Sequence, residues 1–228
     1  VSVGMLAPLD SHEFLFAGDY FDVRRNPGPF EAVTSFQAGG FACDLTEENP
    51  LRLQAMRVEA SFLRTLGLSP LAGRTFTPEE DRPNGPPVAM ISYGLWRSRF
   101  AGDRAVVGRT IPIDGAATTI VGVLPASFEM PTLARADLLL PLALNEATER
   151  SGRALRVFAR LKPETTMAGA KAELQPHFER ALERVPAQFR KEVSFRVRPL
   201  RDRQVGDVWL ASGALFGSMP GTRLARFV

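Results

Sequence analysis

The side chains best suited to chemistry are few and widely spaced in this chain of 228 residues. Its two histidines are His12 and His177, and His12 lacks the second histidine of a zinc-protease helix. Cys43 is the single cysteine, which excludes an intramolecular disulfide and a site with several cysteine ligands. No G-x-S-x-G elbow is present to activate a serine. We therefore expect no catalytic residue, no metal site and no enzyme, with surface histidines and a buried Cys43.

Two other segments could bind ligands, but their spacing does not fit. The acidic run Glu79-Glu80-Asp81 lacks the spaced oxygen ligands of a calcium loop, and Pro78 before it indicates a solvated turn. The glycines at 39–40 and at Gly102 belong to neither a dinucleotide-binding motif nor a P-loop. We therefore expect no cofactor.

Charge and composition argue against a nucleic-acid-binding protein and for a globular protein with a hydrophobic core. The chain has 28 Lys and Arg against 25 Asp and Glu, a net charge of +3, which is too small for a nucleic-acid partner to be expected. A hydrophobic content of 45% is enough for a sizeable core in one large domain or two small lobes. The densest basic stretch contains Arg196, Arg198, Arg201 and Arg203. It indicates an exposed strand face or, as the alternative, proximity to an anionic membrane surface.

The elements that would position these side chains begin with a strand–helix–strand unit. A strand is expected over 1–6 and an alternating strand over 30–38. Between them, a short helix over 20–25 would have Asp19 as its N-cap and end at Asn26, before Pro27.

A second unit of the same kind follows later in the chain. It comprises a strand over 155–161, an amphipathic helix over 167–185 capped by a threonine at 165–166, and a strand over 193–197. Pro176 predicts that the helix kinks or restarts. Two such units indicate an α+β fold with helices on one side of a sheet.

The segment between the two units is expected to be rich in strands. Asp114-Gly115 is a strong hairpin signal, and Trp96 with Phe100 should pack a helix onto a sheet. The expected elements are strands over 51–58, 88–92, 110–113 and 118–123 and helices over 59–66, stopped by Gly67, and 93–100.

Several short sequence motifs follow one another along this chain. They are 61–67, Gly73-Arg74-Thr75-Phe76, Val88 to Trp96, Phe100-Ala101-Gly102-Asp103, Val107-Gly108-Arg109, Val121-Gly122-Val123-Leu124-Pro125 and Asp137 to Pro141. Together they resemble the periplasmic core domain of MacB-like, or FtsX-like, ABC transporter permeases, most clearly from residue 19 to 206. Permeases without an attached ATPase are the most similar.

This resemblance implies a division of the chain. A porter-like lobe would contain residues 1–67 and 143–206, and an inserted β-rich, sabre-like lobe would contain 68–142. Residues 207–228 would form a disordered or foreign tail. The family continues at this point into a long apolar helix, whereas the run 208–219 is short and interrupted by glycine. The chain also has no secretory signal, so we expect a soluble domain. We further expect that its gene is truncated or that its tail is foreign.

The resemblance also implies a function. The domain would sit at the periplasmic face of the bacterial inner membrane, between transmembrane helices, and transmit ATP-driven motion through lobes that shift relative to one another. Its partners would be a separate ABC ATPase subunit, a second permease copy in a homodimer, and a periplasmic adaptor or outer-membrane protein. The alternative is a free-standing periplasmic binding or adaptor domain that holds a lipid, peptide or amphiphile between its lobes.

Overall fold

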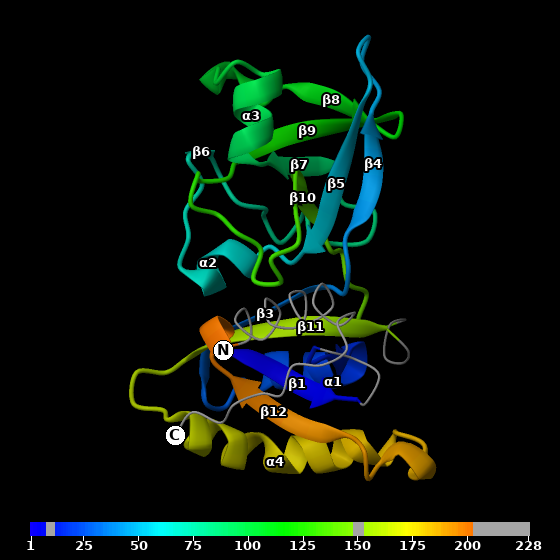
Figure 1. The fold of residues 1–228 in the computed structure, drawn as a ribbon, viewed down its shortest axis with the longest axis vertical. Coiled ribbons are helices and arrows are strands. Elements are labelled where there is room, and N and C mark those ends of the chain that lie inside the picture. Colours follow the sequence, from blue (N-terminus) through cyan, green and yellow to red (C-terminus); the bar gives the residue numbers. More distant parts are fainter. Residues whose placement is uncertain (8–11, 148–152, 203–228) are drawn as a thin grey trace, which may run out of the picture.

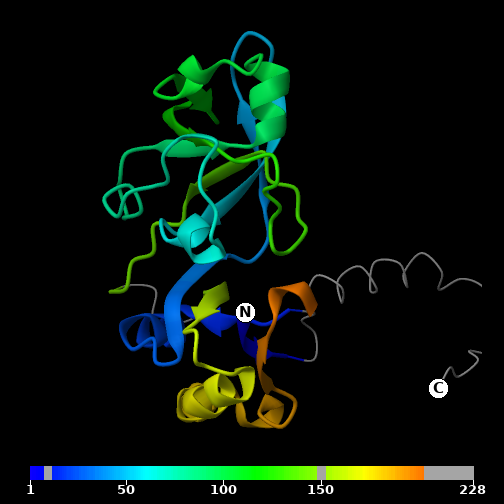
Figure 2. The same ribbon diagram turned by 90° about the vertical axis from the view of Figure 1, so that its left-hand side faces the viewer.

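The computed structural model describes residues 1–7, 12–147 and 153–202, so the predicted tail over 207–228 lies outside the described residues. The elements form two groups stacked along the long axis of the molecule, one above the other in Figure 1 and again after a quarter turn in Figure 2. The chain is a mixture of helices and strands in which strands predominate.

The lower group in Figure 1 is built from both ends of the described chain. It contains β1 (Ser2–Leu6), β2 (Leu15–Phe16), α1 (Ala17–Arg25), β3 (Phe30–Gln37), β11 (Ala154–Leu161), α4 (Met167–Glu183) and β12 (Ser194–Arg198). The strand order is β3-β11-β1-β12, and each neighbouring pair is antiparallel. Helices α1 and α4 share a buried cluster with Val3, Val157 and Phe195 of this sheet, so they pack on one face of it.

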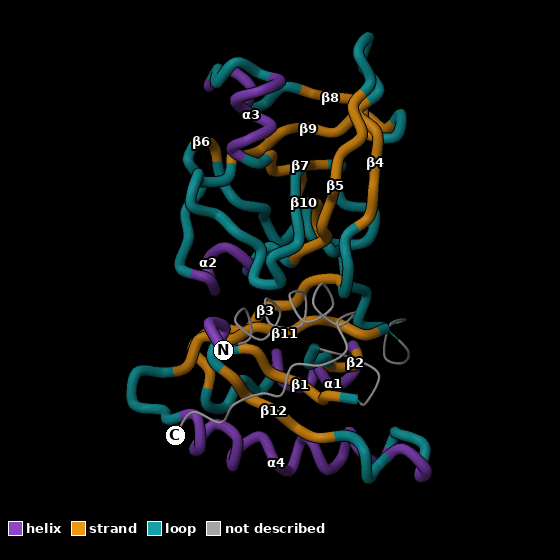
Figure 3. The backbone as a smooth tube through the Cα atoms, in the orientation of Figure 1, coloured by secondary structure: helices purple, strands orange, loops and turns teal. Residues whose placement is uncertain are grey.

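The upper group contains the middle of the chain. Its elements are β4 (Phe41–Leu45), β5 (Leu51–Val58), α2 (Phe62–Leu66), β6 (Ala72–Gly73), β7 (Val88–Ile91), α3 (Tyr93–Arg99), β8 (Thr110–Ile113), β9 (Ala116–Val123) and β10 (Leu138–Pro141). The strands follow the order β10-β7-β9-β8-β4-β5, and a parallel pairing of β10 with β5 closes them into a ring. The tube in Figure 3 shows that α2 lies at the end of this ring nearest the lower group.

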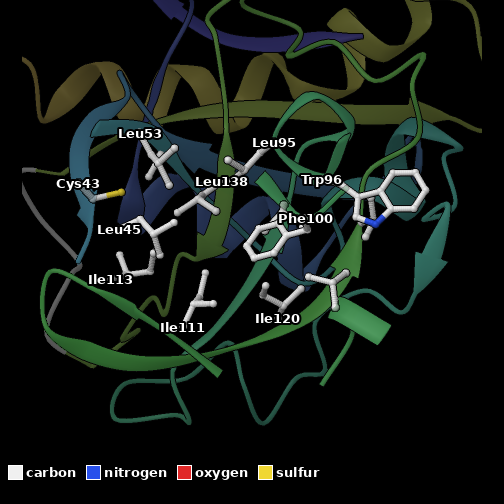
Figure 4. Packing of buried hydrophobic residues seen from close by; sticks show 14 residues of the cluster. Cys43, Leu45, Leu53, Leu95, Trp96, Phe100, Ile111, Ile113, Ile120 and Leu138 are labelled. Carbon is white, nitrogen blue, oxygen red and sulfur yellow. The ribbon is translucent and has the colours of Figure 1, made fainter. Parts of the chain in front are cut away.

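The interior of the upper group confirms two predictions about single residues. Trp96 and Phe100 are buried in one cluster with strand residues such as Ile120 and Leu138 (Figure 4). The Trp96 indole Nε1–H donates a hydrogen bond to the backbone oxygen of Asp103 at 2.8 Å, which satisfies its one polar group. Cys43 is a buried core residue, and burial raises the pKa of its thiol to about 11.

Most predicted elements are confirmed, because their signals are local. Strand β5 has the predicted limits, and helix α2 ends at Gly67, which has a φ of 76°. The hairpin β8–β9 turns at Asp114 and Gly115, whose φ values of 49° and 81° are those that an Asp-Gly turn favours. Thr166 caps α4, accepting a hydrogen bond from the nitrogen of Gly169.

The structure differs from the local predictions at three places. Helix α1 begins at Ala17, whose N–H donates to the backbone oxygen of the distant Arg153, so Asp19 lies in the first turn and is not the N-cap. Helix α4 continues through Pro176, so the restart, one of the two predicted outcomes, does not occur; packing against the sheet maintains the helix. Strand β4 was not predicted. It pairs antiparallel with both β5 and β8 and so joins them in the sheet.

Candidate functional site

The residues considered for chemistry do not come together. Within the described ranges, no group of three or more His, Cys, Asp or Glu side chains is arranged to hold a metal ion. His12 lies before β2 and His177 lies on α4, and both are half-buried, more enclosed than the surface positions predicted for them. Carboxyl groups with several hydrogen-bond partners lie elsewhere, at the junction between the upper and lower groups.

Glu59 is the centre of this junction. It follows β5 and is only 6% exposed. Its Oε2 accepts hydrogen bonds from the Tyr20 hydroxyl and from the backbone nitrogen and hydroxyl of Ser35, the latter two at 2.7 and 2.9 Å. Its Oε1 accepts from Arg24 Nη1 at 2.9 Å. Tyr20, Arg24 and Ser35 all belong to the lower group, so this carboxyl group ties β5 to α1 and β3.

Burial and hydrogen bonding act in opposite directions on these groups. Burial raises the pKa of Glu59, and the donors Tyr20, Ser35 and Arg24 offset part of that rise. Burial also raises the pKa of the Tyr20 hydroxyl, and the neighbouring Glu59 carboxyl group adds to the rise. Both oxygens of the Glu59 carboxyl group and the hydroxyl groups of Tyr20 and Ser35 take part in hydrogen bonds. Buried polar networks stabilise a fold when their members are paired in this way.

Asp81 forms the second polar connection. Its Oδ2 accepts the N–H of Ala60 at 2.7 Å, and its Oδ1 accepts the N–H of Ala143 at 2.8 Å. Ala60 follows β5, and Ala143 lies where the chain returns from β10 to the lower group. Burial raises the pKa of Asp81, although backbone donors, those of Ala143 and Ala60 among them, oppose the rise.

The prediction of a solvated acidic turn was therefore wrong for two of its three residues. Glu80 is buried and forms a bidentate ion pair with Arg74, with nitrogen–oxygen distances of 2.6 and 2.7 Å. That ion pair lowers the pKa of Glu80. Only Glu79 is exposed as expected.

An aromatic cluster fills the space beside these carboxyl groups. Phe62 of α2 packs edge-on against Phe36 of β3, with ring centroids 5.6 Å apart, and Phe36 lies 5.0 Å from Phe158 of β11. At most 1% of each of these residues is exposed. They belong to one buried cluster that continues into the upper group through Met56, Val88 and Leu139. The hydrophobic core thus runs without interruption through the junction.

Two further hydrogen bonds connect α2 and its N-terminal end to the lower sheet. Arg160 Nη2 of β11 donates to the backbone oxygen of Thr65 at 3.0 Å, and the Ser61 hydroxyl donates to Thr34 Oγ1 at 2.9 Å. Relative motion between packed domains is the default unless their interface is large and hydrophobic. The buried aromatic cluster that crosses this junction weighs against the expectation that the two parts shift relative to one another.

The basic stretch near the end of the described chain divides into separate environments. Arg198 forms an ion pair with the buried Glu13, so of the two arginines on this side of β12 only Arg196 is fully exposed. Burial alone would raise the pKa of Glu13, but hydrogen bonds from Arg198 and Ser2 lower it. Arg196 and Arg201 are exposed, while Arg203 lies outside the described residues.

The comparisons with known proteins agree with the sequence resemblance. The sequence model of the MacB-like periplasmic core domain matches residues 5–177, about three quarters of the chain. The chain belongs to this family. It is therefore a periplasmic domain of the MacB-like ABC transporter permease family, whose members work with ATPase subunits at the inner membrane and are not enzymes themselves.

Solved structures share the fold at low sequence identity. The periplasmic region of MacB from Actinobacillus actinomycetemcomitans is 13% identical, with a TM-score of 0.58 over 91% of this chain and 85% of that one. The extracellular domain of the noncanonic ABC-type transporter YknZ from Gram-positive bacteria is 11% identical, with a TM-score of 0.57 over 86% of this chain and all of that one. A domain assigned to a permease protein from Porphyromonas gingivalis is 22% identical, with a TM-score of 0.57 over 86% and 84% of the two chains.

Two further searches gave no result. A search of curated proteins finds no significant relative. Among the described residues, no helix has the length and apolar character needed to cross a bilayer.

Proposed function

We propose that this domain transmits ATP-driven movement from a membrane-embedded permease to the periplasm and that it does so as one mechanical body. The observation that carries the proposal is the junction around Glu59, where buried hydrogen bonds and the Phe36–Phe62–Phe158 cluster join the two groups. A body that is packed throughout passes a displacement from one end to the other, because close-packed interiors are stiff.

The strand order of the lower group would allow movement of the transmembrane helices to reach the domain. Strands β1 and β12 are neighbours in its sheet, with Ser2 opposite Arg198 and Met5 opposite Phe195. In permeases of this family, the segments before and after the domain lead to transmembrane helices. Displacements of both helices would then reach adjacent strands of the same sheet and pass through β11 and β3 to the junction.

The two groups correspond to the two predicted lobes, and we propose this division for the chain. The lower group would be the porter-like lobe and the upper group the sabre-like lobe. The packing supports one change to the predicted limits of 1–67 with 143–206 and 68–142. Strands β4 and β5, Phe41–Leu45 and Leu51–Val58, contribute to the ring and the core of the upper group, so they belong with the second lobe, together with helix α2 that follows them.

The proposed partners follow from the same role. A separate ABC ATPase subunit would supply the energy through the full-length permease, and a second permease copy would complete a homodimer. A periplasmic adaptor or outer-membrane protein would receive the movement. The membrane itself would be engaged through the flanking helices, and no nucleic acid is involved.

The test uses the full-length permease, reconstituted with its ATPase subunit in proteoliposomes. A single spin label is placed at Lys171→Cys, an exposed position on α4, in a Cys43→Ala background. We expect ATP with Mg²⁺ to change the label-to-label distance between the two permease copies, and we expect no change when the ATPase subunit is left out. Equal distances with and without ATP in the complete assembly would contradict the proposal.

One observation favours the second candidate function, a free-standing binding or adaptor domain. A cleft of about 790 Å³ opens beside the junction and is lined by Arg24, Glu59, Arg64, Asp81 and Leu144 among others. The coding region distinguishes the two candidates. Transmembrane segments on both sides of the domain support the transporter, whereas a signal peptide before it and a stop codon after it support the binding domain.

A further inference from the structure

A buried carboxyl group joins the first and last strands of the lower group. Glu13 lies just before β2, and none of its side chain is exposed. Its Oε2 accepts a hydrogen bond from the Ser2 hydroxyl of β1 at 3.0 Å, and its Oε1 forms an ion pair with Arg198 Nε of β12. The two oxygens of one side chain therefore bind two different strands, which are neighbours in the sheet (Figure 1).

Both contacts belong to one cross-strand pair. Ser2 is directly opposite Arg198. The backbone N–H of Ala159 in β11 donates to the oxygen of Val1 at 2.9 Å, so the backbone groups of Val1 face β11. Since this direction alternates along a strand, the backbone groups of Ser2 face β12 and bond to Arg198. The Glu13 carboxylate thus links the side chains of a pair that the backbone also joins.

The segment that carries Glu13 lies directly on β1. A Cβ atom at Gly4 would be 2.5 Å from the backbone oxygen of Phe14, so this close approach requires a glycine. Phe14 and Met5 exchange two backbone hydrogen bonds, at 2.7 and 2.9 Å. Arg156 of β11 donates to the backbone oxygen of Glu13 at 3.1 Å. These bonds hold the backbone of the segment in place independently of the carboxyl group.

Strand β12 depends on such a contact because it lies at an edge. Within the described ranges, β1 is the one strand that pairs with it. It has five residues, Ser194–Arg198, so few backbone hydrogen bonds set its register. On the helix side, Phe195 stacks on Phe178 of α4, with ring centroids 5.2 Å apart. On the opposite face, the Glu13 carboxylate is a charged contact that fixes β12 to β1.

We propose that Glu13 is a positioning residue that locks the register of β1 against β12, so that the two strands move as one unit. The inference rests on the proposed function, in which transmembrane helices deliver movement to these two strands. Sliding of one strand along the other would separate the carboxylate from Ser2 or from Arg198, and a buried charge without its partner is costly. With Glu13 in place, a displacement of either helix is passed to both strands.

The test uses the full-length permease, reconstituted with its ATPase subunit. A spin label at Ser98→Cys, an exposed position on α3 of the upper group, reports the distance between the two copies in a Cys43→Ala background. We expect Glu13→Ala to reduce the ATP-driven change in this distance about twofold or more, because one of the two strands no longer follows the other. Amide hydrogen exchange of β12 in the same assembly should become about tenfold faster, as expected for the loss of a charged hydrogen bond.

A matched control separates the register lock from general stability. Asp19 is a buried carboxyl group in the same group of elements, 8% exposed, and its ion pair with Arg184 joins α1 to α4. Asp19→Ala removes a comparable buried pair that does not join β1 to β12. It should leave both the ATP-driven change in distance and the exchange of β12 as they are in the unsubstituted protein.

A milder variant keeps the inference testable if Glu13→Ala does not fold. Ser2→Ala removes the hydrogen bond on the β1 side and leaves the ion pair, so it should give a smaller loss of the same kind. An undiminished change in distance in folded Glu13→Ala, or in Ser2→Ala where the first variant is unfolded, would refute the inference. Equal losses in Glu13→Ala and Asp19→Ala would refute it as well.

Failure of the proposed function gives a different result. In that case the unsubstituted permease itself shows no ATP-driven change in distance. The exchange rates of β12 then decide the role of Glu13 by themselves: faster exchange in Glu13→Ala but not in Asp19→Ala supports the register lock, and equal rates in the three proteins overturn it.

Discussion

Asp81 Oδ1 lies 2.8 Å from the backbone nitrogen of Ala143, so the loop before β7 holds the segment by which the chain returns to the lower group. The other oxygen of the same carboxyl group holds Ala60 at 2.7 Å. One side chain therefore fixes two segments that are separated by more than eighty residues, at the boundary between the two groups.

Replacement of this carboxyl group should loosen both segments. An asparagine has one acceptor oxygen in place of two, so Asp81→Asn leaves one half-buried N–H without its carboxyl partner and should lower the free energy of unfolding by about 1 kcal/mol. Hydrogen exchange of the Ala60 and Ala143 amides should become faster. The exposed neighbour Glu79→Gln is the matched control and should change neither measurement. Unchanged exchange at both amides in Asp81→Asn would show that the carboxyl group does not hold them.

The aromatic cluster should contribute most to the junction. Phe62→Ala removes a ring that is 1% exposed and contacts Phe36, and it should cost about 3–5 kcal/mol of stability. Chemical denaturation followed by circular dichroism gives the value. Tyr93→Ala, at an aromatic residue that is 36% exposed, should cost far less. Similar losses for the two variants would argue that the junction is loosely packed.

The hydroxyl of Tyr20 should contribute through Glu59. Tyr20→Phe removes one of the donors to Glu59 Oε2 and should lower the free energy of unfolding by about 1 kcal/mol, since the two donors from Ser35 remain. The same change at the exposed Tyr93 is the control. If Tyr20→Phe were as stable as the wild type, the buried network around Glu59 would not depend on this bond.

The pair of Glu80 with Arg74 predicts a defined dependence on pH. The ion pair lowers the pKa of Glu80 below its usual value of 4.5, so the folded protein binds fewer protons than the unfolded chain in the range just below that value. The stability that this group provides is present above pH 4.5 and is lost as the pH falls through the lowered pKa.

Comparison with Glu80→Gln isolates this contribution. The difference in free energy of unfolding between wild type and variant should be largest near neutral pH and should shrink steadily below pH 4.5. Urea denaturation at a series of pH values measures it. A difference that stays constant or grows on acidification would contradict the predicted sign.

Local signals made much of the fold predictable. The Asp114-Gly115 turn, the Gly67 stop and the alternation in β5 and β11 each depend on a few neighbouring residues, and each was correctly predicted. Strand β4 also had a signal, because Phe41, Cys43 and Leu45 alternate with less apolar residues.

The junction was not predictable, because its contacts join residues far apart in the chain. Nothing near Asp81 indicates that its carboxyl group reaches Ala143, and Glu59 has the sequence environment of an ordinary surface residue at the start of a helix. The start of α1 was misplaced for the same reason, since its first N–H bonds to Arg153. Long-range pairing of polar groups is decided by tertiary structure, which local propensity does not encode.

If the two groups move as one body, the distance between a point on the upper group and a point on the lower group stays constant during transport. Spin labels at Ser98→Cys on α3 and Lys171→Cys on α4, both exposed, report this distance in the full-length permease with Cys43→Ala. We expect one narrow distance distribution between these two labels within a single copy, unchanged by ATP, while the distance between the two copies changes. A distribution within one copy that broadens, splits or shifts on ATP addition would contradict it.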